Sequence, residues 1–214
     1  MDLARHMSVD ILSTFDTNND RLPIIIDKYF KKYDASISHK KRSKATVNEI
    51  IRNRGIIDYI IEESSSKKMR NIQPKLKSIL RLGCYELLFD EIIPEFAAIH
   101  SSVELGKNLM NKKSGSMVNA ILRNIQRKQD SDPSWLKSIK DNNIERSFPN
   151  WLIKKWRKQF GEKNTKKLCK AYLKKSPMFL RVDRNQLSLK KAINLLNQNA
   201  IKVKRHDIVY GFLK

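Results

Sequence analysis

The chain has 214 residues, and its hydrophobic fraction of 40% is sufficient for the core of one or two domains. Its formal net charge of +22, from 44 Lys and Arg against 22 Asp and Glu, favours a polyanionic partner such as nucleic acid. We expect a cytoplasmic protein, because the sequence has no apolar run of about 18 residues that would span a membrane, no signal peptide and only two unrelated cysteines.

Residues 2–61 carry the apolar spacing of helices. The first predicted helix covers residues 2–15, and a second, which we expect Asp20 to cap, covers residues 22–33. Residues 38–44 are polar and basic and are predicted to form a loop. A third helix is predicted over residues 47–61, where isoleucines recur on one face.

Three further helices are predicted between residues 76 and 128. The first bears one apolar stripe in which Gly83 leaves room for a close neighbour. The second opens after Pro94 and carries small residues such as Gly106, and the third starts after Gly115 and Ser116. Residues 129–133 are polar and end in a proline, so they mark a predicted domain boundary.

Beyond residue 133 the pattern changes to a small α+β unit. In its first helix, Trp151, Trp156 and Phe160 have the spacing of core residues, and in its second helix Ala171 and Tyr172 are expected to face inward. The predicted elements are helices over residues 149–160 and 163–174, a strand over 178–182, a helix capped by Ser188, and a strand pair over 201–204 and 208–213.

The residue identities between positions 79 and 124 carry a family resemblance. The matching segments are ILRLGCYELL (79–88), IPEFAA (93–98), VELG (103–106) and VNAILRN (118–124). They resemble the NusB-like domain, most closely the version fused to bacterial ribosomal RNA cytosine-C5 methyltransferases of the RsmB (Sun/Fmu) type. Residues 4–12 and 50–58 upstream, and FPNWL (148–152) with residues 176–182 downstream, extend the resemblance over nearly the whole chain.

This resemblance implies both a fold and a function. The expected fold is mainly α: a NusB-like helical bundle of two three-helix subdomains in residues 1–130, followed by a basic, truncated intermediate α+β domain in residues 131–214. The expected function is that of an RNA-binding, substrate-targeting N-terminal region of an S-adenosylmethionine-dependent 16S rRNA (cytosine-C5) methyltransferase. Its expected partners are ribosomal RNA and the C-terminal methyltransferase domain of the full-length chain, which would bind S-adenosylmethionine.

No residue of this segment has the context of a catalyst. A cytosine-C5 methyltransferase needs a thiolate that adds to the base and a carboxylate near a Pro–Cys turn. Cys84, however, lies in an apolar helix and Cys169 in a lysine-rich one, and neither is next to a proline. We therefore expect both thiols to be structural, and whether the protein is an enzyme depends on the sequence after Lys214. The histidines are too scattered to join either cysteine in a metal site, so no metal is predicted.

The positive charge is unevenly distributed along the chain. Residues 1–130 hold 23 Lys and Arg against 16 Asp and Glu, a net +7, whereas residues 131–214 hold 21 against 6, a net +15. Within residues 151–175 there are ten basic residues and one acid. Biased base composition explains part of the lysine excess, but it does not explain this inequality, which favours nucleic acid.

The candidate RNA contacts are basic residues in five segments. The arginines Arg5, Arg52 and Arg123 rank highest because they occupy positions that match the resembled family, and arginine binds phosphate bidentately. Arg81, among apolar neighbours, is interpreted instead as a buried partner between helices. The full candidate set is Arg5, His6, Lys40, Lys41, Arg42, Arg52, Arg54, Arg123, Arg127, Lys154, Lys155, Arg157 and Lys158.

Two alternatives from other functional classes stay open. One is a stand-alone transcription antitermination adaptor that binds RNA together with a ribosomal protein; the Trp- and Lys-rich unit after residue 133 argues against it. The other is a protein-interaction scaffold whose lysines reflect genome composition alone. Heparin competition in an RNA gel shift separates the scaffold from an RNA-binding module, and the coding sequence after Lys214 separates the adaptor from the enzyme.

Overall fold

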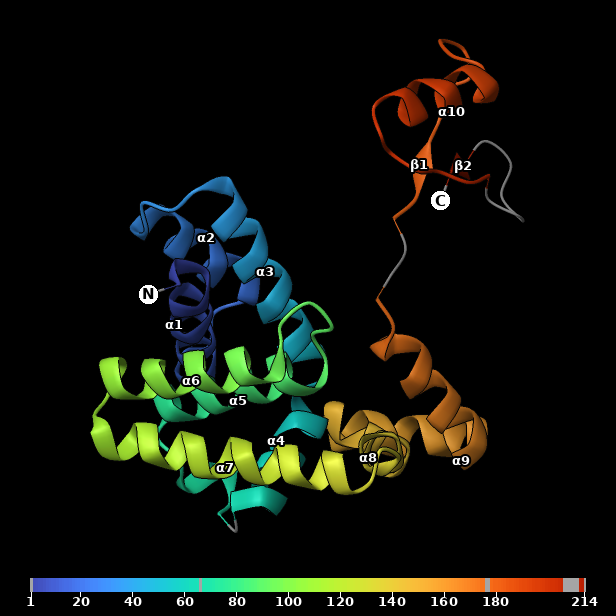
Figure 1. Cartoon of the computed structure of the whole chain (residues 1–214). Coiled ribbons are helices and arrows are strands. Elements are labelled where there is room, and N and C mark those ends of the chain that lie inside the picture. Colours follow the sequence, from blue (N-terminus) through green and yellow to red (C-terminus); the bar gives the residue numbers. More distant parts are fainter. Residues whose placement is uncertain (1, 66, 176–177, 206–211, 214) are drawn as a thin grey trace. The chain divides into compact units, whose positions relative to one another are not determined.

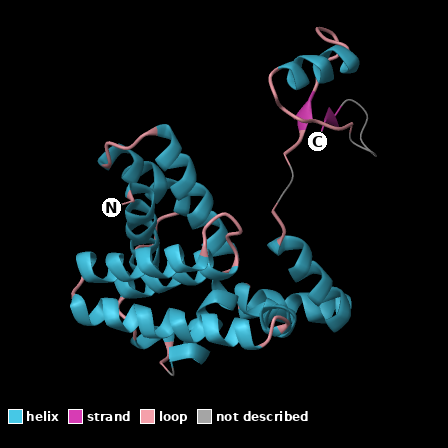
Figure 2. Ribbon diagram, in the orientation of Figure 1, coloured by secondary structure: helices cyan, strands magenta, loops and turns pink. Residues whose placement is uncertain are grey.

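Helices make up nearly all the regular structure of the chain (Figure 2). The computed structural model describes residues 2–65, 67–175, 178–205 and 212–213. It divides into two compact units, unit 1 (Met1–Leu173) and unit 2 (Lys174–Lys214). The prediction of a mainly α fold is confirmed for the described residues.

Unit 1 contains most of the helices of the described structure (Figure 1). Its elements are α1 (Leu3–Thr17), α2 (Leu22–Lys32), α3 (Ile37–Arg52), α4 (Arg54–Ser65), the 3-10 turn η1 (Met69–Asn71), α5 (Pro74–Leu88), α6 (Glu95–Leu109), α7 (Lys112–Ser131), α8 (Trp135–Asn143), the 3-10 turn η2 (Ile144–Ser147) and α9 (Asn150–Leu173).

One continuous apolar core joins α1 to α7. Helix α1 packs on α2, α3 and α5, while α5, α6 and α7 pack side by side (Figure 1). Gly83 permits this close packing, because a Cβ atom there would lie 2.6 Å from both Leu122 Cδ1 and Ser102 Oγ. Gly106 likewise lets α6 approach Gly115 of α7, which confirms the expected role of the small residues.

The predicted basic loop over residues 38–44 is wrong, because these residues belong to α3. Ser36 caps this helix, its Oγ accepting a hydrogen bond from the His39 amide at 3.3 Å. Ser43, Val47 and Ile50 form the buried face at i, i+4 and i+7, and the lysines lie outside it. A small polar residue on the buried face had hidden the periodicity.

Other helix boundaries also differ from the prediction. The helix expected over residues 47–61 is divided at Asn53 into α3 and α4. Arg21, not Asp20, is the N-cap of α2 and makes no side-chain capping bond. Helix α7 begins one turn earlier than expected, because the Asn111 Oδ1 accepts a hydrogen bond from the Ser114 amide at 2.9 Å. Helix α8 and turn η2 were not predicted at all.

Helix α9 turns back on itself at Gly161, whose φ of 75° and ψ of 168° are non-helical. Trp156 and Tyr172 are sixteen residues apart, yet their rings stack with centroids 5.5 Å apart. In a straight helix they would be separated by roughly 24 Å along the axis. The two helices predicted over 149–160 and 163–174 are thus confirmed as the two arms of α9.

The two arms of α9 enclose a second, smaller core with η2. Ile144, Ile153 and Cys169 are buried there, with Phe148 and Trp156 packed against them. The inward orientation predicted for Trp151, Phe160 and Ala171 is wrong, because the buried face of the first arm is centred on Ile153 and Trp156 and that of the second arm on Thr165 and Cys169. Tyr172 stacks on Trp156 but is also largely exposed. Trp151 is 66% exposed, Phe160 43% and Tyr172 62%, and Ala171 is also exposed.

Unit 2 is a small α+β unit, with elements β1 (Leu180–Arg181), α10 (Leu189–Gln198) and β2 (Phe212–Leu213). The side chain of Ser188 caps α10, as predicted. Strands β1 and β2 are antiparallel, so the last strand pairs with residues 180–181.

The predicted hairpin of residues 201–204 with 208–213 differs from this ladder. Residues 201–204 form no strand, although Arg205 makes an isolated bridge to Leu213. Residues 208–211 of the predicted strand lie outside the described residues.

Candidate nucleic-acid interface

Arg81 cannot contact RNA at the surface, because its side chain is buried inside unit 1. Its guanidinium donates to both carboxylate oxygens of Asp58, at 2.6 and 2.8 Å, and to Asp16 at 2.6 Å. Burial alone would lower the pKa of Arg81, but Asp58 and Asp16 outweigh it and raise that pKa. The interpretation of Arg81 as a buried partner between helices is confirmed.

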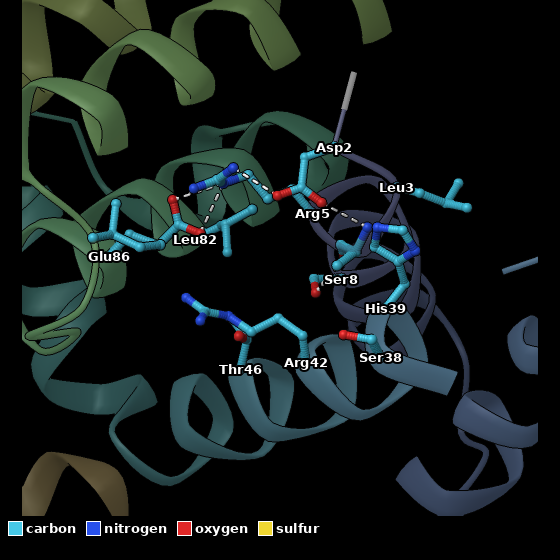
Figure 3. Close-up of a pocket in the computed structure, with 12 residues that line it drawn as sticks. Asp2, Leu3, Arg5, Ser8, Ser38, His39, Arg42, Thr46, Leu82 and Glu86 are labelled. Carbon is cyan, nitrogen blue, oxygen red and sulfur yellow. Dashed lines mark hydrogen bonds and ion pairs between the residues drawn. The ribbon is translucent and has the colours of Figure 1, made fainter. Parts of the chain in front are cut away.

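A hollow between α1, α3 and α5 has a volume of about 480 Å³ and is lined by two of the predicted arginines. Figure 3 shows how its lining residues lie. Arg5 lies between Asp2 and Glu86, with nitrogen–oxygen distances of 2.7 and 2.9 Å. Arg42 reaches into the same hollow and pairs with Asp90 at 2.7 Å. Burial raises the pKa of Glu86 even though Arg5 opposes the shift. Both arginines are therefore already engaged by carboxylates of the same chain.

The two predicted RNA-contacting arginines at the end of α3 and the start of α4 are also paired with carboxylates. Arg52 pairs with Glu49, and Arg54 pairs with Asp16 at 3.0 Å. On α7, by contrast, Arg123 is exposed and bonds only to the neutral Gln126 among the described residues, at 3.0 Å. Of the remaining candidates, His6 packs its ring on Tyr33, Lys40 is half-buried, and Lys41 and Arg127 are exposed.

The first arm of α9 carries three lysines that, unlike Arg5, Arg42, Arg52 and Arg54, have no acidic partner among the described residues. Lys154, Lys155 and Lys158 are exposed, and within the described residues none of them forms an ion pair. Arg157 is the exception, with Glu145 at 2.5 Å and Glu162 at 3.8 Å. The whole of α9 holds eight Lys and Arg against one Glu, so it presents a dense set of available cations.

A second hollow, of about 260 Å³, lies at the start of α9 and adds a residue that was missed from the sequence. It is lined by Arg146, Lys154 and Arg157, by Asn150 and Ile153, and by the carboxylate of Glu145 that pairs with Arg157. The guanidinium of Arg146 also lies over the ring of Tyr59, 4.5 Å from its centroid. Arg146 is an isolated basic residue in the sequence, and its place in this hollow depends on the fold.

The described residues offer neither a set of metal ligands nor a helix suited to a membrane. No group of three or more His, Cys, Asp or Glu side chains in those residues is placed to hold a metal ion. No helix in the described part of the chain has the length and apolar character to cross a membrane.

Two protein families match the chain in succession. A model described as the NusB family matches residues 2–127. A model described as the Methyltr_RsmF/B-like, ferredoxin-like domain matches residues 148–212. The predicted domain limits at residues 130 and 131 fall between the two matched ranges and stay a prediction.

Curated relatives resemble nearly the full length of the chain. A probable ribosomal RNA small subunit methyltransferase B of Bacillus subtilis (strain 168) is 26% identical over 215 residues, covering 99% of this chain and 47% of the relative. A probable methyltransferase of the same name from Synechocystis sp. is 27% identical over 175 residues, covering 81% of this chain and 39% of the relative. The chain therefore spans less than half the length of these relatives.

Two solved structures share the fold. A chain in the crystal structure of a plectonemic RNA supercoil superposes with a TM-score of 0.57 at 22% identity, covering 60% of this chain and 95% of that one. The crystal structure of PH0851 superposes with a TM-score of 0.60 at 16% identity, covering 98% of this chain and 47% of that one. At these identities the likeness concerns the fold alone.

Proposed function

Because the chain belongs to the NusB family and continues into a segment like the RsmF/B ferredoxin-like domain, we propose that it is an RNA-binding targeting region. It would direct an S-adenosylmethionine-dependent (cytosine-C5) methyltransferase domain of the full-length protein to 16S ribosomal RNA. The names of the curated relatives support this proposal. We place the activity, its cofactor and its catalytic domain, as part of this proposal, in the portion of such relatives that this chain does not span.

The observation that carries the RNA-binding proposal is the exposure of Lys154, Lys155 and Lys158 in the first arm of α9, which have no acidic partner among the described residues. Cations without a carboxylate partner attract a polyanion, and each phosphate they neutralise releases counterions. An RNA that meets Lys154, Lys155 and Lys158 displaces no intrachain ion pair, whereas one that meets Arg5 or Arg42 competes with a carboxylate. The first encounter is therefore expected at α9, with the predicted contacts of Arg5, Arg52 and Arg123 forming during later docking.

The segment is proposed to bind and position RNA without performing chemistry. Burial raises the pKa values of both Cys84 and Cys169, so neither thiol is readily available as a thiolate. A cytosine-C5 methyl transfer needs a thiolate that can reach an extruded base. We therefore derive no chemical step from these residues.

Salt dependence of binding to a small-subunit ribosomal RNA fragment tests the proposal. With about five phosphates neutralised, the plot of log affinity against log salt concentration should have a slope of about −4. Heparin, a non-nucleic polyanion, should compete at low salt. A flat salt response, or no binding at low salt, would overturn the proposal and favour a protein scaffold.

A further inference from the structure

Trp151 is an exposed aromatic residue without a partner. Its exposed fraction is 66%, and no aromatic or cation–π contact engages its ring within the described residues. Trp156, five residues later, lies in a cluster with Phe148 and Tyr172. A tryptophan offers a large apolar face whose burial is favourable, so this exposed indole is available to stack on a ligand.

Three lysines of α9 share one face of the helix with this indole. Successive residues of a helix are rotated by about 100°, so Trp151 falls within the arc occupied by Lys154, Lys155 and Lys158, at spacings of i+3, i+4 and i+7. The buried residue Ile153 lies on the opposite side of the helix. One solvent-facing surface therefore combines an aromatic face with three ammonium groups that have no acidic partner among the described residues.

We propose that Trp151 stacks on an unpaired RNA base while Lys154, Lys155 and Lys158 bind the phosphates on either side. This inference rests on the proposed function and deepens it, because it names single-stranded RNA as the ligand of this surface. In the interior of a duplex both faces of each base are already stacked, so the indole has no free face to meet there. In a loop or bulge the base is available and the backbone supplies the charge.

Charge favours RNA over a protein as the occupant of this surface. An apolar protein face would strip water from three lysines without returning a negative charge. A single strand carries one phosphate for each base and so matches an aromatic face flanked by cations. The competing occupant, a protein surface that covers Trp151, is an outcome of the experiment below.

Two RNA probes and three variants test the inference. The probes are an unstructured oligouridylate of twelve nucleotides and a blunt RNA duplex of twelve base pairs. The variants are Trp151→Ala, Trp151→Phe and, as a matched control, Phe160→Ala, which removes another exposed aromatic ring from the same arm of α9. Because Trp151 and Phe160 are exposed, all three variants should keep the far-ultraviolet circular dichroism and thermal midpoint of the parent.

Trp151→Ala should weaken binding of the single strand by about ten-fold, the size of one lost base–aromatic stack, and leave duplex binding unchanged. Trp151→Phe should recover most of that loss, and Phe160→Ala should bind both probes like the parent. The salt slope of Trp151→Ala should match the parent, because stacking releases no counterions.

Each failure has a distinct meaning. If the parent binds RNA with the expected salt slope but Trp151→Ala loses nothing for the single strand, the stacking inference is wrong and the proposed function stands; Trp151 then fits a protein surface. An equal loss for both probes would also overturn the inference. If the parent binds neither these probes nor ribosomal RNA at low salt, the proposed function itself fails.

Discussion

The arginines of α1, α3, α4 and α5 and the lysines in the first arm of α9 differ in whether a carboxylate of the same chain engages them. The arginines of those four helices meet carboxylates: Arg81 is buried between Asp58 and Asp16, and Arg5 bonds to Glu86. In the first arm of α9 the lysines face solvent without acidic partners in the described structure. The net charge of a segment therefore does not measure how many of its cations can bind a ligand. An arginine that is ion-paired within the chain must leave its carboxylate to contact a phosphate.

Arg81→Met tests the structural side of this comparison and should have the largest effect. Removing the guanidinium leaves Asp16 and Asp58 without their main partner inside the protein, so the free energy of unfolding should fall by about 3–5 kcal/mol. Urea unfolding measures this loss. The control Arg127→Met removes an exposed arginine of α7 and should change stability by less than about 0.5 kcal/mol. Equal losses in both variants would mean that the buried network contributes little.

Gly161→Ala should have the next largest effect, and it acts on α9. A Cβ atom at this position meets nothing within 4 Å, so the cost comes from the backbone alone. The φ of 75° and ψ of 168° are accessible essentially only to glycine, which predicts a loss of about 2 kcal/mol. Thermal unfolding measures it, with Gln159→Ala as the exposed control on the same arm.

The fluorescence of Trp156 supplies a second readout of Gly161→Ala. If the turn opens, the stack of Trp156 on Tyr172 is lost and the emission of that indole shifts. Full stability with unchanged emission would show that the turn does not depend on glycine.

Asn111→Ala returns to the α1–α7 core and should cost about 1 kcal/mol. The Asn111 side chain caps α7 through the Ser114 amide, and alanine cannot accept that hydrogen bond. Asn111→Asp keeps an acceptor and should retain parent stability in urea. If Asn111→Asp loses as much as Asn111→Ala, the cap is not the cause.

Removal of either buried cysteine should have the smallest effect, a change in how the free energy of unfolding depends on pH. Cys84 lies in the large core and Cys169 in the small one. Burial raises the pKa of both thiols, and more for Cys84 in the large core. Above the ordinary value of 9.0, the unfolded chain releases a proton that the folded chain retains, so stability falls as pH rises.

Cys84→Ala should remove a decline of about 1 kcal/mol between pH 9 and pH 10 in urea unfolding. Cys169→Ala, in the small core of α9, should remove less. A decline unaffected by Cys84→Ala would place its origin in other groups.

The sequence predicted the helices better than their ends. The apolar stripe that contains Ile79 and Leu80 was sufficient to locate α5, whereas α3 was shortened because Ser43 interrupts its buried face. Helix α8 was missed because it has no fully buried residue and so shows only a weak apolar pattern.

The sequence predicted which segments of the candidate site are rich in cations, but not which of those cations are free of acidic partners. The cations of α9 are visible as a local excess of lysine. That Arg5 is held by Glu86, however, depends on a contact between residues 81 positions apart, which no local pattern reveals. The exposure of Trp151 was within reach of the sequence, because the lysines at i+3, i+4 and i+7 mark its face as the solvent side.

The most direct test of the account compares two triple variants of equal charge. Lys154, Lys155 and Lys158 of α9 are changed to Gln in one, and the exposed Lys28, Lys31 and Lys44 of α2 and α3 in the other. Binding to the ribosomal RNA fragment is measured across salt concentration. The α9 variant should reduce the magnitude of the salt slope by about two, and the α2–α3 variant should leave it near the parent value. Equal slopes in the two variants would contradict the claim that α9 supplies the cations that capture RNA.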